Sequence, residues 1–311
     1  MSEKLYTVST SPHIKSKDTV STVMRDVLIA LIPAALAGVY FFGMNAFLVI
    51  VTAVASAVLS EYVFEKITKR PITIGDLSAV VTGLLLAFNL PPTLPLWMVA
   101  VGSAFAIIVV KCFYGGVGQN IVNPALAARA FLLAAYPVRM TTWTLDGTTG
   151  PTPLGILRGD GSLALPKLFD VFVGNIGGCI GETSALALLI GAAYLLYKKI
   201  ITWHIPVSYI GTVFILTTIL GRKGLMSGNG IYEILLGGLI LGSFYMATDY
   251  TTSPMTKTGH LIFGISCGLL TTLIRLYGGY AEGVSYSILI MNLFVPFIDK
   301  FTNPRVFGGG K

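Results

Sequence analysis

Two adjoining stretches, MRDVLIALIPAALAGVYFFG (residues 24–43) and NAFLVIVTAVASAVLSEYV (residues 45–63), decide the class of fold. Each is an apolar run of about 20 residues, the length that an α-helix needs to cross the ~30 Å hydrocarbon core of a bilayer. A soluble domain of this size does not build a core large enough to bury such runs, whereas a bilayer buries them directly. The pair therefore predicts two membrane-spanning helices.

The composition of the whole chain points the same way. Of its 311 residues, 54% are apolar and 11% are charged, whereas soluble domains carry about 25% charged residues. A net charge of +7 would suggest a nucleic-acid surface in a soluble protein, but here the basic residues lie in short loops and indicate orientation. Cys112, Cys179 and Cys267 form no CxxC pair and no metal-ligand cluster, so each is expected to be a small apolar helix residue.

The apolar runs predict an all-α, polytopic membrane protein with about ten spans. Residues 1–22 are polar and too long and mixed for a signal peptide, and they are interpreted as a cytoplasmic tail. The third and fifth segments are short, and the third runs into Asn89-Leu90-Pro91-Pro92, which indicates either broken helices lining a cavity or simply short spans. The ten segments are 24–43, 45–63, 77–90, 94–113, 121–136, 179–197, 205–220, 231–248, 261–277 and 284–298.

The distribution of lysine and arginine predicts the orientation. With a cytoplasmic N-terminus, 14 of the 21 basic residues fall in inside loops, six fall outside, and Arg129 lies within the fifth span. Cytoplasmic loops carry the excess of basic residues, so both termini, including the tail 301–311, are predicted inside. The long loop 137–178 is predicted outside.

The two halves of the chain share an order of elements. Lys-Cys-Phe-Tyr-Gly-Gly (111–116) ends the fourth span, and Arg-Leu-Tyr-Gly-Gly (275–279) ends the ninth, each after a proline-containing break and an apolar helix. Units of five spans must have opposite orientations, which predicts inverted repeats over 23–136 and 179–300 with a site near their interface. A common helix ending explains the shared motif alone, but not the shared order.

Three polar groups of residues are candidates for function. No Walker loop, HExxH motif or Rossmann fingerprint is present, so NTP hydrolysis, zinc hydrolysis and a dinucleotide fold lack support. The first candidate is residues 145–155, LDGTTGPTPLG, whose glycines, prolines and hydroxyls predict an extended, non-helical loop; a plain surface turn is the simpler interpretation.

The second candidate joins Asn120, Asn123 and Arg129 around the fifth span. Residues three apart share a helix face, so both amides can point at one ligand, and an arginine inside a span is costly enough to indicate function. Alternatively, the asparagines cap the helix and Arg129 pairs with a loop carboxylate. The third candidate is Asp249, at the inner end of the eighth span beside Thr248, Thr251 and Thr252, which could equally be a helix-end carboxylate in water.

The loop and four other motifs resemble one family of membrane proteins, the RnfD/NqrB family. Asp-Gly-x-Thr-Gly-x-Thr-Pro-Leu (146–154) is similar to the sequence at which a flavin transferase links FMN to threonine in this family, whose members belong to the Rnf complex and to the sodium-translocating NADH:quinone reductase. The remaining motifs follow the family's order over nearly the whole chain: SPH (11–13), MRDVLIALIP (24–33), NIVNPALAAR (120–129) and MATDYTTSP (246–254). The short polar tail favours the Rnf branch.

The resemblance implies two flavins. By position, Thr152 would carry FMN through a phosphoester, with Asp146, Gly147 and Thr149 forming the recognition sequence. Pro151 stands where alanine is usual and stiffens the loop, and Thr149 stands where serine is frequent. A non-covalent riboflavin would lie between the repeats near Asn120, Asn123 and Asp249. No catalytic residue and no metal ligand is expected, since the flavins supply the redox chemistry.

The function implied is that of an electron-carrying subunit in an ion pump of the bacterial inner membrane. Electrons from reduced ferredoxin would pass through partner subunits (A, B, C, E and G) and this chain toward NAD⁺, coupled to Na⁺ or H⁺ movement. The chain alone would not turn over, and its maturation would need the flavin transferase. Composition and repeat alone also allow a secondary transporter or channel for a small solute, with Asp249 and the asparagines lining its site.

Overall fold

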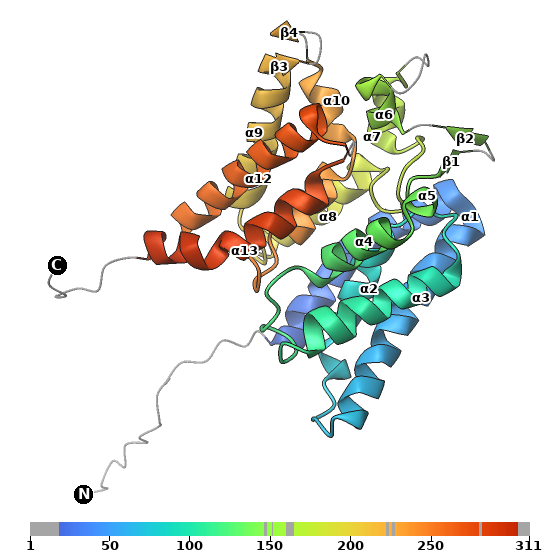
Figure 1. The fold of residues 1–311 in the computed structure, drawn as a ribbon, viewed down its shortest axis with the longest axis vertical. Helices are drawn as coiled ribbons and strands as arrows, with labels where there is room; N and C mark the ends of the chain where they lie inside the picture. Colours follow the sequence, from blue (N-terminus) through green and yellow to red (C-terminus); the bar gives the residue numbers. More distant parts are fainter. Residues whose placement is uncertain are drawn as a thin grey trace, which may run out of the picture.

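The computed structural model describes residues 19–145, 148–150, 152–159, 165–221, 224–225, 228–279 and 282–303. In these ranges the chain consists mainly of helices and the connections between them, and its strands form two short hairpins (Figure 1). The helices are α1 (Val20–Ile67), η1 (Ile74–Asp76), α2 (Ser78–Phe88), α3 (Leu96–Ala104), η2 (Phe105–Cys112), α4 (Pro124–Ala135), α5 (Pro137–Met140), α6 (Pro153–Arg158), α7 (Leu168–Val173), α8 (Ala185–Tyr197), α9 (His204–Ile219), α10 (Gly230–Leu235), α11 (Leu239–Leu241), η3 (Gly242–Met246), α12 (Lys257–Tyr277) and α13 (Val284–Thr302). Strand β1 (Trp143–Leu145) pairs antiparallel with β2 (Thr148–Gly150), and β3 (Leu220–Gly221) with β4 (Gly224–Leu225). The prediction of an all-α polytopic membrane protein is confirmed.

Every predicted apolar segment contains helix. The first two lie in α1, which kinks at Gly43, where a φ of 68° turns the chain back. Three helices are individually long and apolar enough to cross a bilayer, namely α1, α12 and α13, among the residues that the structure describes. The third and fifth segments are short, as expected: α2 has 11 residues and α4 has 12, so each rises only about 16–18 Å.

Local sequence explains where several helices begin. Thr19 and Thr22 form a reciprocal capping box at the start of α1. Asn123 caps α4, with Pro124 at its first position, and Ser184 and Thr256 cap α8 and α12 through their side-chain oxygens. These caps satisfy backbone N–H groups that have no partner inside the helix and would be costly to bury.

The first helices of the two halves pack antiparallel. Tyr194 near the end of α8 donates to Asp26 near the start of α1 at 3.0 Å. Further along, a Cβ on Gly191 would lie 1.9 Å from the carbonyl oxygen of Ala30, and one on Gly38 would lie 2.7 Å from Ile180. The sequence numbers fall on one helix as they rise on the other, so the two halves begin with opposite senses, as inverted repeats require.

Breaks in the third and eighth segments meet at the connection between the halves. The backbone N–H groups of Ile180 and Gly181 donate to the carbonyl oxygens of Leu90 (3.1 Å) and Phe88 (3.0 Å), so this connection continues the hydrogen bonding where α2 ends. The eighth segment is interrupted between α10 and α11, where Gly237 and Gly238 have φ values of 71° and 68°. The proline-containing sequence at 252–254 lies between η3 and α12, where it separates the eighth segment from the ninth as expected.

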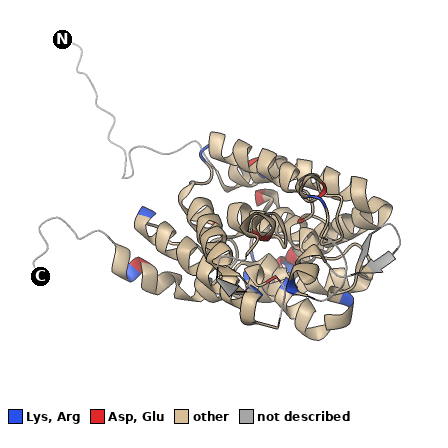
Figure 2. Ribbon diagram, turned by 90° about the horizontal axis from the view of Figure 1, so that it is seen from above, with Lys and Arg blue, Asp and Glu red and all other residues tan. Residues whose placement is uncertain are grey.

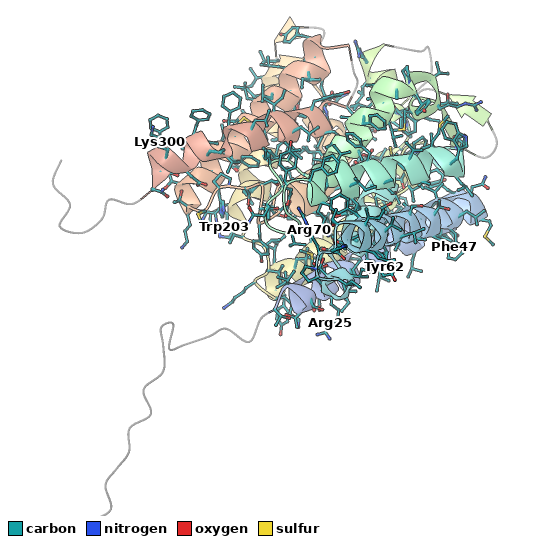
Figure 3. The ribbon with its side chains drawn as sticks, turned by 60° about the horizontal axis from the view of Figure 1, so that its bottom comes forward. Arg25, Phe47, Tyr62, Arg70, Trp203 and Lys300 are labelled. Carbon is teal, nitrogen blue, oxygen red and sulfur yellow. The ribbon has the colours of Figure 1, made fainter. Side chains whose placement is uncertain are left out.

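The surface of the helices suits lipid. Charged residues are sparse along them (Figure 2). On α1 the residues that face the bundle are small, such as Ala30, Ala34 and Ala53, which allows close helix packing. Large apolar residues point outward: Phe47 is 47% exposed and Tyr62 is 36% exposed. Figure 3 shows Phe47 toward one end of the helices, whereas Arg25, Arg70, Trp203 and Lys300 lie toward the other.

The connection predicted for 137–178 is more structured than expected. It contains the short helices α5, α6 and α7 and the β1–β2 hairpin, which lie together at the end of the bundle opposite the first turn of α1 (Figure 1). The prediction of an extended, non-helical loop over 145–155 is wrong from Pro153 onward, because Thr152 caps α6 and Pro153 occupies its first position.

Candidate functional site

One cavity brings together residues that the sequence assigned to a common site. This space of about 410 Å³, here called the Asp249 cavity, is lined by Asn120 and Asn123 from the first half and by Asp249 from the second. Its volume lies within the ~300–1,000 Å³ of small-molecule pockets. Its walls are mainly apolar, from α1, α2, α8 and η3, and include Val23, Leu85 and Leu195. The cavity therefore lies between the halves, near the ends of several helices.

The polar groups of the Asp249 cavity already have partners within the chain. The Asn123 side-chain oxygen accepts from Ala125 N at 3.1 Å and caps α4, and its Nδ2 donates to the carbonyl oxygen of Met246 at 3.4 Å. Asn120 Nδ2 donates to Val122 O at 3.1 Å, and Asp249 accepts from the hydroxyls of Thr251 and Thr252. The capping role considered for the asparagines is thus found at Asn123, and its bond to Met246 also ties the two halves together.

A buried lysine also lines the Asp249 cavity. Lys111, at the end of η2, is 3% exposed, pairs with Glu61 and donates to Ser78 Oγ at 2.6 Å. The sequence places Lys111 at the end of the fourth span and gives no sign of this pairing, because its partner Glu61 lies fifty residues away in another helix. The π-helical winding of η2, a feature often found at functional sites, gave no sequence signal.

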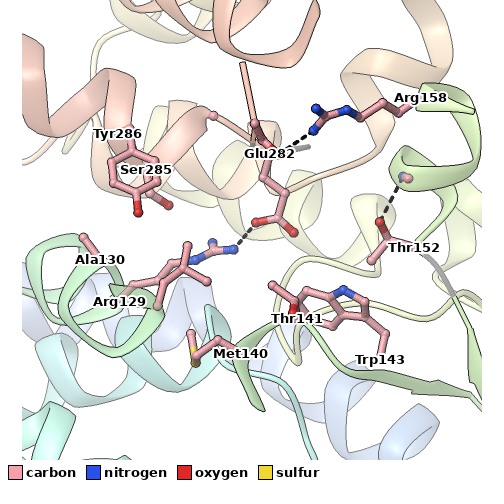
Figure 4. A pocket seen from close by; sticks show the side chains of 14 residues that line it. Arg129, Ala130, Met140, Thr141, Trp143, Thr152, Arg158, Glu282, Ser285 and Tyr286 are labelled. Atoms are coloured by element: carbon pink, nitrogen blue, oxygen red, sulfur yellow. Dashed lines mark hydrogen bonds and ion pairs between the residues drawn. The ribbon is translucent and has the colours of Figure 1, made fainter. Parts of the chain in front are cut away.

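A second cavity of about 290 Å³, the Thr152 cavity, lies by the α5–α6 connection (Figure 4). Thr152, Arg158 and Trp143 lie to one side of Glu282, whereas Arg129 lies to the other with Ser285 and Tyr286. Arg158 donates to the carbonyl oxygens of Gly278 and Gly279, both at 2.7 Å. Two guanidinium groups and one threonine hydroxyl therefore surround one space.

Thr152 is half-buried and caps α6. Its hydroxyl oxygen accepts from Gly155 N at 3.1 Å. Of the other loop residues predicted for flavin attachment, Thr149 lies in β2, paired with Thr144. Asp146 and Gly147 lie outside the described residues. The structure therefore places Thr152 at a cavity and does not place the whole recognition sequence.

Arg129 pairs with carboxylates from two connections, in agreement with the alternative that it pairs with a loop carboxylate. Its guanidinium donates to Glu182 Oε1 at 2.7 Å, to Glu282, and to Asn89 Oδ1 at 2.8 Å. Cys179 Sγ lies 3.9 Å from Arg129 Nη2 and donates to the carbonyl oxygen of Asn89 at 3.3 Å. The expectation that every cysteine is an apolar helix residue outside any ligand cluster is wrong for Cys179, which precedes α8 and lies beside two carboxylates.

Helix α4 forms part of both cavities. Asn123, Pro124 and Ala125 face the Asp249 cavity, whereas Arg129, Ala130 and Leu133 face the Thr152 cavity. Arg129 follows Ala125 by four positions, a rise of about 6 Å along the helix. The two predicted groups of site residues are thus close neighbours across one helix.

Sequence reasoning missed three further polar residues. Glu182 and Glu282 lie in connections far apart in the chain and meet only at Arg129. Asn292 lies in the apolar α13; in the amide orientation that satisfies both its atoms, it accepts from Asn123 N at 3.1 Å and donates to Thr252 O at 3.0 Å. An asparagine in a span and acidic residues beside glycine-rich connections were the available signals.

Comparison with known proteins gives one consistent result. A profile of the NQR2, RnfD, RnfE family matches residues 7–308. The chain is 49% identical to the D component of the Na⁺-translocating ferredoxin:NAD⁺ oxidoreductase complex of Acetobacterium woodii, an alignment covering 99% of this chain and 97% of that protein. It is 48% identical to the D component of the proton-translocating ferredoxin:NAD⁺ oxidoreductase complex of Clostridium ljungdahlii (98% and 97% covered). It is 38% identical to the D component of the ion-translocating oxidoreductase complex of Stutzerimonas stutzeri (94% and 93% covered).

Proposed function

Because this chain belongs to the NQR2, RnfD, RnfE family, we propose that it is the membrane flavoprotein subunit of an ion-translocating ferredoxin:NAD⁺ oxidoreductase. The relatives are named as the D components of such complexes, from which the electron donor, the acceptor and the coupling to ion movement are inferred. The bundle places two cavities on either side of α4, one beside Thr152, and this arrangement is the observation that carries the proposal. It suits a protein that passes electrons between two closely spaced flavins.

The first flavin is FMN, linked by a phosphoester to Thr152. The residues around Thr152 fit this group: its hydroxyl lies at the wall of a 290 Å³ cavity, and Arg158 and Arg129 line the same space. Guanidinium groups form strong hydrogen bonds to phosphate oxygens, and Arg158 lies on the same side of the cavity as Thr152. Trp143, also in this wall, can contact an aromatic ring.

The second flavin is riboflavin, held without a covalent bond in the Asp249 cavity. Its isoalloxazine ring suits the apolar walls, and its carbonyl and N–H edges suit the carboxylate of Asp249 and the amide of Asn120. Asn123 contributes by fixing the start of α4 and by holding it to Met246, since both ends of its amide are engaged. Lys111 supplies a positive charge at the wall, beside Glu61.

When bound, the flavins supply the electron-transfer chemistry. The chain supplies position and an environment with little water: most side chains around the Asp249 cavity are apolar, and Asn89, Asn123 and Arg129 are all less than a tenth exposed. The complex would include further subunits that bring electrons from ferredoxin and deliver them to NAD⁺. The two termini are predicted in the cytoplasm and the α5–α7 connection outside, where a flavin transferase would reach Thr152.

Flavin analysis of the purified complex tests the proposal. The denatured chain should keep one FMN through gel electrophoresis, and riboflavin should appear in the extract of the same sample. A chain that carries no flavin in either fraction, from cells that contain the transferase, would contradict the proposal and favour a solute transporter. A chain with covalent FMN and no riboflavin would contradict only the assignment of the Asp249 cavity.

A further inference from the structure

Two carboxylates, one buried and one partly buried, share one guanidinium at the connection between the halves. Arg129 donates to Glu182 at 2.7 Å and also to Glu282. The side chains are 8%, 5% and 20% exposed for Arg129, Glu182 and Glu282. Within the described ranges, no other ion pair reaches either carboxylate.

The neighbouring basic residues that the structure describes, Arg158 and Arg275, form no ion pair with either carboxylate. Arg275 pairs with Glu233 at 3.1 Å, and the guanidinium of Arg158 donates to two backbone carbonyl oxygens. With both carboxylates ionised, the cluster of Arg129, Glu182 and Glu282 therefore carries one negative charge in excess. Burying an uncompensated charge is expensive, so this place favours a bound cation.

A small cavity adjoins both carboxylates. It measures about 20 Å³ and is lined by Glu182, Glu282, Thr183 and Thr152. A space of roughly 10–15 Å³ on this scale holds one water-sized occupant. Thr183 is 2% exposed, and its hydroxyl oxygen has no hydrogen-bond partner. Since buried polar groups almost always have a partner, the hydroxyl indicates an occupant of this Thr183 cavity.

Beside the Thr183 cavity, the backbone of the broken eighth segment passes very close to the side chain of Glu182. A Cβ on Gly238 would lie 2.6 Å from Glu182 Oε1, so only glycine lets the broken eighth segment pass this carboxylate. Gly237, in the same break, also lines the cavity. Discontinuous helices that meet between inverted repeats are a recurrent setting for ion sites in membrane proteins.

The donor set selects the kind of cation. Carboxylate and hydroxyl oxygens suit hard ions rather than transition metals. Cys179 also borders the cluster, but its thiol donates to the carbonyl oxygen of Asn89 and is not available as a thiolate ligand. One excess negative charge is balanced by one monovalent ion, whereas a divalent ion would leave a buried positive charge.

We propose that Glu182, Glu282 and Thr183 bind one Na⁺ ion in the Thr183 cavity. Because Thr152 lines the same cavity, the ion would lie beside the attachment point of the FMN. Its participation in coupled ion transport rests on the proposed function, whereas its binding does not.

Hydrogen–deuterium exchange of the intact complex, read by mass spectrometry on peptides covering residues 174–184, tests the site. The amides of Ile180 and Gly181, bonded to the end of α2, report opening of this connection. Exchange should be slower in NaCl than in choline chloride of equal ionic strength, by about tenfold at a Na⁺ concentration ten times the dissociation constant. Equal exchange in the two salts would overturn the proposal.

A pair of matched variants assigns any effect to the cavity. Thr183→Val and Ser103→Ala each remove a buried hydroxyl that has no partner, but Ser103 does not line the cavity. Thr183→Val should abolish the difference between the salts, and Ser103→Ala should retain it; retention in Thr183→Val would overturn the site. Glu182→Gln should act as Thr183→Val does. The same digest reports the mass of the Thr152 peptide, so failure of the Na⁺ site and absence of the FMN are distinguished.

Discussion

Replacing Asp249 by alanine should weaken the binding of the non-covalent flavin. Asp249 accepts from Thr251 at 3.0 Å and from Thr252 at 3.2 Å, so its carboxylate is held in place at the wall of its cavity. Removing one buried partner of a ligand costs on the order of 1–3 kcal/mol, equivalent to a roughly 5- to 150-fold weaker affinity. Asn123→Ala would be harder to interpret, because it also removes the cap of α4, at a cost of about 1 kcal/mol.

The assay is the loss of riboflavin from the purified complex during dialysis, with covalent FMN measured on the same samples. Asp26→Ala is a matched control: Asp26 accepts from Tyr194 near the same ends of the helices, but it does not line the cavity. Asp249→Ala should lose riboflavin faster than the wild type, while Asp26→Ala should not, and both should keep the FMN. Wild-type retention in Asp249→Ala, or equal loss in both variants, would refute the placement of riboflavin.

Three further predictions follow from the packing. Arg129→Met should destabilise the complex by about 3–5 kcal/mol, because it leaves the carboxylates of Glu182 and Glu282 without their partner. Changing both glutamates to glutamine as well should restore most of the thermal stability. A triple variant no more stable than Arg129→Met would contradict the pairing. Gly191→Ala should prevent assembly, since its Cβ would lie 1.9 Å from a carbonyl oxygen of α1, whereas Gly211→Ala, with open space around it, should be tolerated; equal yields of the two would argue against the α1–α8 contact. With the native cysteines buried, an impermeant thiol reagent on intact cells should label Thr141→Cys but not Thr202→Cys, and the reverse pattern would invert the orientation.

The apolar pattern alone located the helices, because a run of apolar residues in a bilayer has few alternatives to a helix. The antiparallel packing of α1 and α8 agrees with the prediction of inverted halves, which the sequence makes because two units of five spans must have opposite orientations. Sequence further grouped Asn120, Asn123 and Asp249, which line one cavity. That grouping came from the predicted repeat and from the resemblance to a family, because no local pattern joins residues 123 and 249.

Features that depend on long-range contacts were not predictable. Leu-Gly-Gly-Leu at 236–239 reads as a continuous apolar span, and its break is seen only where Gly238 passes Glu182. Likewise, the two carboxylates that pair with Arg129 belong to separate connections, and the second, Glu282, is more than 150 residues away in the sequence. The helical start at Pro153 was missed because the glycines and prolines around it indicated a turn, although threonine followed by proline is also a helix-start signal.

The most direct test of the account is the mass of the peptide that contains Thr152, from complex produced together with the flavin transferase. The wild-type peptide should be heavier by one FMN linked through a phosphoester. Thr152→Ala should give the unmodified mass and no fluorescence on the denatured chain, whereas Thr152→Ser should keep a hydroxyl that can accept the flavin. An unmodified wild-type peptide, or flavin fluorescence that survives in Thr152→Ala, would contradict the account.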